Sequence, residues 1–405
     1  MEYIIYRLPN GICCIHKRVR SEVVHCSLTV GAGSRDELES EHGIAHLLEH
    51  SLFKGTARRR AYQINCRLEN LGGELNAYTT KEETVIHASS LKGDYAKAVE
   101  LIADIAFNST FPEREIEKEK AIIVDEINAY KDSPSERVYD DFEDLVFAGS
   151  SLGHNILGGK GSVMKFDRRE LLNFIGRTYN TDRMVFATIG NISDKRFMAV
   201  CDRYFGAIPV SARDFVCNGN SAYSPFEKTV NRNWHQAHCI IGNRAYGMNE
   251  DKRVVLSLLT NILGGPSANS LLNIAVRERN ALSYNVESGY TAFSDAGIAS
   301  IYFATDREYL DQCTELVYKE LHHIIRGNLS PRFFSMARKQ FIGQMTIAME
   351  SREGDMLGAA RSMLISGSVD GMEEVKRKIM SLTLKEVTEV ANEIYGENLS
   401  TLIYK

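Results

Sequence analysis

A short segment near residue 50 carries the side chains best suited to chemistry. Its sequence is His46-Leu47-Leu48-Glu49-His50. On a helix, side chains three and four positions apart lie on one face, so both imidazoles and the Glu49 carboxylate would point into one volume. Two histidines with this spacing can occupy neighbouring corners of a zinc tetrahedron, and the glutamate then lies beside the remaining coordination position. The segment is therefore the inverted form of the common zinc-protease motif.

A catalytic zinc site usually has a third protein ligand and one open position. The segment after Pro112 offers Glu119 and Glu126, whose separation of seven residues (126 − 119) is two helical turns. Apolar neighbours predict that this face is half buried, where an unpaired carboxylate is costly. We predict Glu126 as the third ligand and Glu119 as the residue that orients a ligating histidine. The alternative for Glu119 and Glu126 is a solvent-exposed helix face of Glu and Lys residues. The alternative for the motif is a helix whose histidines and glutamate are solvated or paired within the core.

The surrounding segments alternate between strand and helix patterns. Turn residues and apolar periodicity predict strands at residues 3–6, 12–15, 23–30 and a strand pair at 75–89, with helices at 36–54, 94–107 and 112–130. The pattern predicts that the motif lies inside the first helix and that both candidate acids lie in the third.

A second copy of this plan follows later in the chain. Val24 to Leu28 resembles Ala237 to Ile241, an offset of 213 residues (238 − 25). Further helix and strand patterns then recur in the same order, at residues 252–263, 283–290, 297–304, 309–325 and after Pro331. We predict an α+β protein of two homologous halves. The first half would span residues 1–217, a linker 218–228, and the second half 229–405.

Composition limits the partners and the compartment. The chain has 405 residues and a formal net charge of −5, which argues against nucleic acid as a partner because phosphate binding usually needs a basic surface. No apolar run approaches the roughly 20 residues needed to cross a bilayer. The segment after Met1 is too short and polar for a secretion signal, and no transit peptide is expected before the first strand. The eight cysteines include no Cys-x-x-Cys pair. We expect a cytoplasmic protein with reduced thiols and no membrane partner.

Longer stretches match a known pattern. They are Gly31-Ala32-Gly33-Ser34-Arg35-Asp36-Glu37, then Gly43 to His50, Phe53-Lys54-Gly55-Thr56, Leu71-Gly72-Gly73 and Asn76-Ala77-Tyr78-Thr79. With these stretches the chain resembles the pitrilysin/insulinase family of inverted-motif zinc metallopeptidases. In that family the third zinc ligand follows the second motif histidine at the separation seen here for Glu126 (126 − 50 = 76). A second glutamate at the place of Glu119 is also usual. The pair Leu47-Leu48 departs mildly from the usual aromatic-Leu pair.

The resemblance extends to the second half. Arg277 and Tyr284 have the spacing of a family arginine and tyrosine that come from the half without metal and contact bound peptide. The resemblance implies two α/β-sandwich halves, each a mainly antiparallel sheet covered by helices, with Asn76 and Ala77 on a strand edge that receives the peptide. Subunits of the mitochondrial-processing-peptidase-like subgroup pair so that four halves enclose a chamber. Because this chain keeps both signatures, we expect a homodimer.

The resemblance thus implies a zinc metalloendopeptidase that holds one Zn²⁺ per chain and cleaves short or unfolded peptides. Glu49 would be the general base, and Arg277 or Tyr284 would hold a substrate carbonyl or the oxyanion. One alternative is a non-catalytic peptide-binding or assembly subunit of the same fold, although such members usually lose a motif residue. Another is a zinc hydrolase with a non-peptide substrate. Other histidines, among them His42 and His154, are expected to be structural.

Overall fold

Contacts divide the chain into two compact units, each assembled from segments that are distant in sequence. The computed structural model describes residues 3–215, 222–231 and 234–405. The first unit comprises Met1–Ala129, His154–Gly219 and Ala348–Gly371, and the second comprises Tyr130–Gly153, Asn220–Ile347 and Met372–Lys405. The linker predicted at 218–228 begins outside the described residues, and its last two residues open a strand of the second unit.

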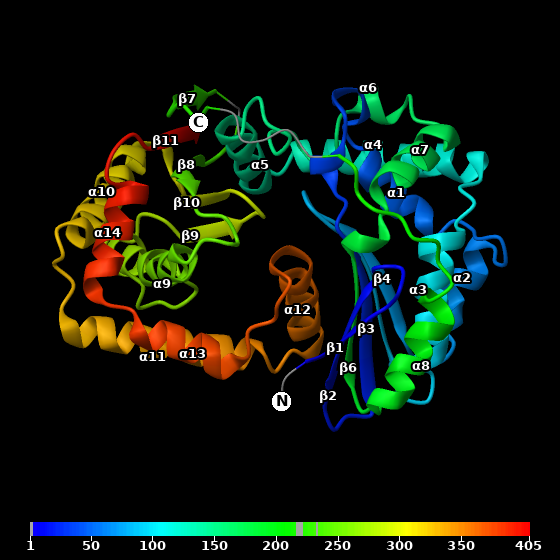
Figure 1. Ribbon diagram of the computed structural model, residues 1–405. Helices are drawn as coiled ribbons and strands as arrows, with labels where there is room; N and C mark the ends of the chain where they lie inside the picture. Colours follow the sequence, from blue (N-terminus) through cyan, green and yellow to red (C-terminus); the bar gives the residue numbers. More distant parts are fainter. Residues whose placement is uncertain (1–2, 216–221, 232–233) are drawn as a thin grey trace. The chain divides into compact units, whose positions relative to one another are not determined.

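A six-stranded sheet in the order β1-β2-β6-β3-β5-β4 forms the centre of the first unit (Figure 1). Strands β2 and β6 run parallel, and the other neighbours are antiparallel. The strands are β1 (Ile4–Arg7), β2 (Cys13–Arg18), β3 (Val23–Val30), β4 (Glu74–Thr79), β5 (Thr84–Leu91) and β6 (Met184–Gly190). Strand β4 therefore lies at one end of the sheet, which matters for the site below.

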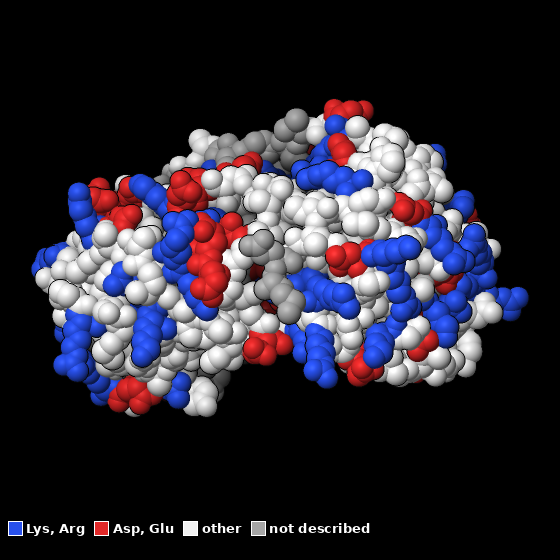
Figure 2. Space-filling view, turned by 60° about the horizontal axis from the view of Figure 1, so that its bottom comes forward, with Lys and Arg blue, Asp and Glu red and all other residues white. Residues whose placement is uncertain are grey.

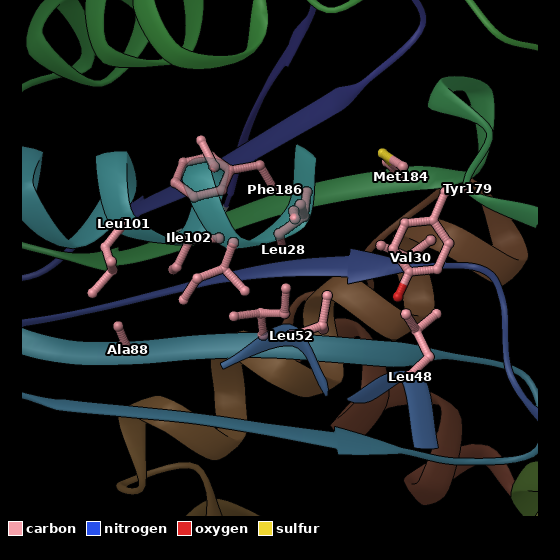
Figure 3. Packing of buried hydrophobic residues seen from close by; sticks show 14 of the residues in the cluster. Leu28, Val30, Leu48, Leu52, Ala88, Leu101, Ile102, Tyr179, Met184 and Phe186 are labelled. Carbon is pink, nitrogen blue, oxygen red and sulfur yellow. The ribbon is translucent and has the colours of Figure 1, made fainter. Parts of the chain in front are cut away.

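Helices cover one face of this sheet because alternate residues of β3 and regularly spaced residues of the helices are apolar. Leu52 of the motif helix α1 lies near Leu28 of β3, and Leu48 lies near Val30 of the same strand (Figure 3). Leu101 and Ile102 of α3 belong to the same buried cluster. The helices of this unit are α1 (Ile44–Leu52), α2 (Ala61–Glu69), α3 (Tyr95–Asn108), α4 (Glu113–Lys131), α6 (Lys160–Val163), α7 (Arg168–Thr178) and α8 (Asp194–Phe205).

The second unit repeats the plan. Its sheet has the order β7-β11-β8-β10-β9, which is the order β2-β6-β3-β5-β4 with each strand replaced by its counterpart. The strands are β7 (Glu227–Val230), β8 (Ala237–Ala245), β9 (Asn285–Ala292), β10 (Gly297–Thr305) and β11 (Ser400–Tyr404). Its helices include α9 (Lys252–Gly264), α10 (Leu310–Ile325), α11 (Pro331–Ala348), α13 (Met372–Ser381) and α14 (Leu384–Tyr395). The predicted α+β class with two related α/β halves is confirmed.

Each unit covers the other face of its sheet with a helix from a distant segment. Helix α5 (Pro134–Val146) follows α4 in sequence but packs on β8, β10 and β11 of the second unit. Helix α12 (Arg352–Ser366) follows α11 but packs on β3 and β6 of the first unit. Because α4 and α11 are counterparts, the two halves exchange equivalent helices.

One helix prediction was wrong at its start. The helix predicted over residues 36–54 begins at Ile44, and the preceding residues form two short 3₁₀ turns, Ser34–Asp36 and Glu39–Glu41. The carboxylate of Glu37 is buried between these turns and the helix start, and it accepts hydrogen bonds from the backbone. This buried contact therefore lies within the segment where the sequence pattern predicts continuous helix.

Acidic and basic side chains are interspersed over the face drawn in Figure 2. Such mixing accords with the small formal net charge of −5. Among the described residues, no helix combines the length and the apolar character that crossing a bilayer requires.

Candidate metal centre

Helix α1 presents two different faces. Leu47, Leu48 and Leu52 are fully buried against the sheet, while His46, Glu49 and His50 lie on a face that is only partly covered. The motif spacing therefore produces the arrangement it predicts, with an apolar face that fixes the helix and a polar face that stays accessible.

Helix α4 brings Glu126 to the two imidazoles. Its Oε2 atom lies 3.8 Å from Nε2 of His46 and 3.6 Å from Nε2 of His50. One donor atom from each residue lies within 4.8 Å of the other two, so these three form a group able to hold a metal ion. A tetrahedral zinc with bonds of about 2.0–2.2 Å separates its ligand atoms by about 3.4 Å, so the donor set fits zinc.

Electrostatics also favour a cation at this point. Burial, with a contribution from His50, lowers the pKa of His46 to about 4, so the imidazole is neutral near pH 7. Neutral imidazole nitrogens and a carboxylate oxygen are all electron-pair donors, and their close approach is stabilised by a positive ion between them. The three residues named as ligands from the sequence are thus brought together.

Glu119 contacts His50 on the side away from Glu126 and is not itself one of the three candidate metal ligands. It is 4% exposed. His50 donates from Nδ1 to its Oε2 atom at 3.2 Å, and Lys54 donates from Nζ to its Oε1 atom at 2.8 Å. Such a contact fixes which imidazole nitrogen faces the metal. Among the described residues, the buried Nδ1 atom of His46 has no equivalent hydrogen-bond partner.

Glu49 is held in an environment that disfavours its charge. Burial first, and then the charge of Glu126, raise the pKa of Glu49 to about 7, while a hydrogen bond from the Thr79 hydroxyl works in the opposite direction. A pKa near neutrality suits a group that must both take and give a proton. Thr79 was not among the predicted site residues, although it directly follows the Asn76-Ala77-Tyr78 segment.

The strand that contains Asn76 and Ala77 lies beside α1 at the edge of its sheet. In the described part of the chain, β4 pairs with β5 on one side, where Asn76 is opposite His87, and with no strand on the other. Ala77 packs on the core and Asn76 is exposed. An unpaired strand edge can hydrogen-bond an extended peptide.

Arg277 and Tyr284 belong to the second unit, so they are described apart from the metal centre. The guanidinium of Arg277 lies 5.4 Å from the ring centroid of Tyr284. Arg277 lies in a short π-helical segment, Asn273–Glu278, and Tyr284 is 86% exposed. The two side chains are therefore neighbours that face solvent within their unit.

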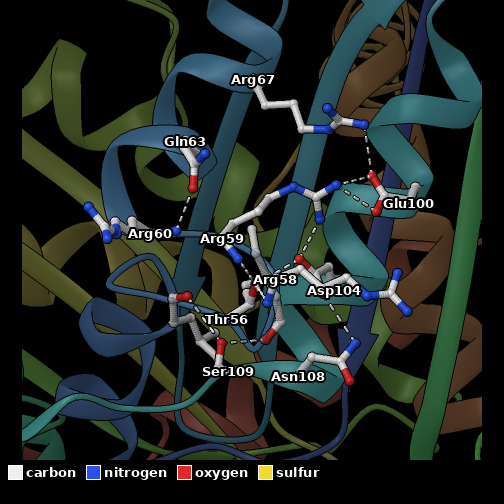
Figure 4. A network of polar contacts seen from close by, with 12 residues as sticks. Thr56, Arg58, Arg59, Arg60, Gln63, Arg67, Glu100, Asp104, Asn108 and Ser109 are labelled. Atoms are coloured by element: carbon white, nitrogen blue, oxygen red, sulfur yellow. Dashed lines mark hydrogen bonds and ion pairs between the residues drawn. The ribbon is translucent and has the colours of Figure 1, made fainter.

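A polar network anchors the chain just after α1 (Figure 4). The guanidinium of Arg59 donates to the carboxylate of Asp104, and it also donates to the carboxylate of Glu100 at 2.8 Å. The hydroxyl of Thr56 also donates to Asp104 at 2.8 Å, and Arg67 binds Glu100. Because both carboxylates belong to α3, this network ties the end of the motif helix to a helix of the core.

Comparisons with known proteins agree with this geometry. Residues 14–160 match the family model described as "Insulinase (Peptidase family M16)", and residues 165–341 match "Peptidase M16 inactive domain". An uncharacterized zinc protease of Mycobacterium tuberculosis is 32% identical over 403 residues, covering 98% of this chain and 91% of that protein. An uncharacterized zinc protease of Bacillus subtilis is 29% identical over 396 residues, covering 97% and 96%.

Solved structures show the same fold. A protease from Helicobacter pylori superposes with a TM-score of 0.91 at 17% identity, covering 100% of this chain and 99% of that one. A Pseudomonas fluorescens structure titled as a peptidase M16 inactive domain gives a TM-score of 0.92 at 19% identity, covering 100% and 98%. The residues of the metal centre lie in the part that the first family model matches.

Proposed function

Because the chain belongs to the insulinase family of peptidases (peptidase family M16), we propose that it is a zinc-dependent endopeptidase that cleaves short or unfolded peptides. The observation that carries the proposal is the meeting of His46, His50 and Glu126 around one point. The relatives from Mycobacterium tuberculosis and Bacillus subtilis are named as zinc proteases, and these names support the same activity.

One Zn²⁺ per chain would be held by Nε2 of His46, Nε2 of His50 and Oε2 of Glu126. Zinc bound there would polarise the scissile carbonyl and make water more acidic. Glu119 keeps His50 in the tautomer whose Nε2 atom is free to bind, because its carboxylate accepts the hydrogen at Nδ1.

Glu49 is the proposed general base. Its carboxylate takes a proton from the attacking water and then returns it to the leaving amine. A pKa of about 7 supports both transfers near neutral pH, because neither protonation state is strongly disfavoured. The Thr79 hydroxyl orients the carboxylate through its hydrogen bond.

The proposed peptide site is the open edge of β4. Backbone hydrogen bonds along Asn76 and Ala77 would hold an extended chain with little demand on its side chains, which suits short or unfolded substrates. We assign Arg277 and Tyr284 to the substrate carbonyl or the oxyanion. Their solvent-facing guanidinium and phenol support that assignment, since both can donate hydrogen bonds.

We further propose that two copies pair as a homodimer around the peptide, in the cytoplasm. The chain carries both the metal ligands and the Arg277–Tyr284 pair, so a second, different subunit is not needed. The seven free cysteines of the described residues suit a reducing compartment. Sedimentation of the active protein tests the pairing, and a monomer that cleaves peptides at full rate would contradict it.

The deciding experiment is the change Glu49→Gln. The variant should retain zinc, because Glu49 is not a ligand, and should lose at least about 10²-fold in turnover of unfolded peptides. Glu69→Gln, an exposed glutamate on α2, is the matched control. Glu126→Gln should instead lose zinc on dialysis. Undiminished cleavage by the Glu49 variant would remove the assignment, and a wild-type protein that binds peptides without cleaving them would favour the non-catalytic alternative.

A further inference from the structure

We propose that Glu37 is a positioning residue for the metal centre: its side chain caps the N-terminus of α1 and thereby sets the orientation of His46. This inference deepens the proposed function, because it assumes that the ion held by His46, His50 and Glu126 is zinc. It assigns a role to a residue that the proposed mechanism does not use.

Helix α1 has no cap of its own. Its N-cap is Gly43, which has a φ of 98° and no side chain. The first N–H groups of a helix need acceptors, usually supplied by a Ser, Thr, Asp or Asn at this position. Here Glu37, six residues before Gly43, supplies acceptors for two of these N–H groups. Its Oε2 atom accepts from the Gly43 N–H at 3.0 Å, and its Oε1 atom accepts from the Ala45 N–H at 2.9 Å.

The carboxylate is fixed from its other side as well. The Glu37 side chain is completely buried, and Nε2 of His154 lies 3.0 Å from its Oε2 atom. The ring of His42 stacks on His154 with centroids 3.9 Å apart, and the Lys81 amino group donates to the backbone carbonyl of His154. Residues 42–45, residue 81 and residue 154 therefore hold the Glu37 carboxyl group against one helix start.

Close backbone contacts leave this arrangement little freedom to shift. A Cβ added at Gly43 would lie 2.7 Å from the carbonyl oxygen of Leu157, and one added at Gly158 would lie 2.3 Å from that of His42. The start of α1 and the 154–158 loop thus pack backbone to backbone. A rotation of the helix start would have to break both this packing and the two hydrogen bonds to Glu37.

The two histidines are held by different means. His50 is oriented through its side chain, by Glu119. The buried Nδ1 atom of His46 lacks such a partner among the described residues, although a metal-binding histidine usually has one. Ala45, whose N–H binds Glu37, directly precedes His46. The backbone of the first helical turn is therefore what orients His46, and Glu37 is what fixes that backbone.

Neighbouring acids do not duplicate this contact. Glu41 pairs with the guanidinium of Arg177, and Asp36 pairs with Arg213. Glu41→Gln is therefore a matched control, since it removes a carboxylate from the same segment but no hydrogen bond to α1.

The test measures zinc affinity by competition with a chelator, without peptide. Glu37→Gln should bind zinc about 10–100-fold more weakly, the range for losing a residue that orients a ligand, and the Glu41 control should match the wild type. Because Glu37 acts through His46, adding Glu37→Gln to His46→Ala should cause no further loss. Adding it to Glu119→Gln should multiply the two losses, because that residue acts on His50. The proposal would be overturned if the Glu37 variant bound zinc within twofold of the wild type. It would also be overturned if adding Glu37→Gln weakened zinc binding equally in the His46→Ala and Glu119→Gln variants.

Hydrogen exchange of the wild-type protein keeps the proposal testable should the variants fail to fold. The Gly43 and Ala45 amides should be protected in the metal-free protein despite lying at a helix start. Rapid exchange at both would overturn the capping role. Because this measurement needs neither zinc nor peptide, it separates a failure of the capping proposal from a failure of the proposed peptidase function.

Discussion

Replacing Glu119 should weaken zinc binding much more than it weakens the fold. The residue is 4% exposed and has two partners. His50 donates to it at 3.2 Å, and Lys54 donates at 2.8 Å. Glu119→Ala removes both acceptors, whereas Glu119→Gln keeps a neutral oxygen that can still accept from one of them.

The two losses differ in size. Losing the residue that orients a metal-binding histidine costs about 10–100-fold in metal affinity, which corresponds to about 1.4–2.7 kcal/mol. The side chain of Lys54 is 25% exposed and can turn toward water, so its lost ion pair contributes about 1 kcal/mol or less to stability. We expect about a tenfold loss of zinc affinity for the Gln variant and nearer a hundredfold for Ala.

The assay is chelator competition with the purified protein, paired with urea unfolding of the metal-free form. Glu117→Gln is the control, because that side chain lies on the same helix, is 63% exposed and pairs with Lys120. Zinc affinities of both Glu119 variants equal to that of the control would refute the reasoning. So would a loss that appears only in the unfolding of the metal-free form.

Three further outcomes follow from buried charges. Burial raises the pKa of Glu37 to about 8 from 4.5 and lowers that of His154 to about 4 from 6.5. The folded protein holds the Glu37 proton more tightly than the unfolded chain, so its stability falls as pH rises toward 8. Between pH 6.5 and 8 the free energy of unfolding of the wild type should fall by about 2 kcal/mol relative to that of Glu37→Gln, measured in urea. A difference between the two proteins that does not change with pH would contradict this. In metal-free protein the lowered pKa of His46, about 4, should reduce stability as pH falls from 6.5 toward 4, and His46→Asn should abolish that slope. Arg59→Ala leaves the buried Asp104 carboxylate without its cation and should cost about 3 kcal/mol in the same assay, against no measurable cost for the exposed Arg60→Ala.

The grouping of His46, His50 and Glu126 could be predicted from the sequence because its signals are local or regularly spaced. The motif fits on one helical turn, and Pro112 marks the start of the helix that contains Glu126, which was predicted over 112–130 and spans Glu113–Lys131. Turn residues likewise located the strand pair that includes β4.

Contacts that depend on packing gave no such signal. Lys54, in the turn after α1, pairs with Glu119 of α4. Glu37 reaches the helix start only because a segment predicted as helix forms short turns. The apolar spacing of α5 indicates that one face is buried. It does not indicate which of two similar sheets that face covers, since both present apolar strands.

The exchange of α5 and α12 has a consequence for how the chain matures during synthesis. The residues of the first sheet that α12 covers, which include Cys13, Ile15, Val185 and Ala187, leave the ribosome long before that helix, which ends at Ser366. An apolar surface therefore stays open while most of the second repeat is being translated, a period in which a nascent chain is prone to aggregate. The unit that contains the His46–His50–Glu126 cluster can therefore be completed only after residue 366 has been translated, by which time most of the second repeat has already been made.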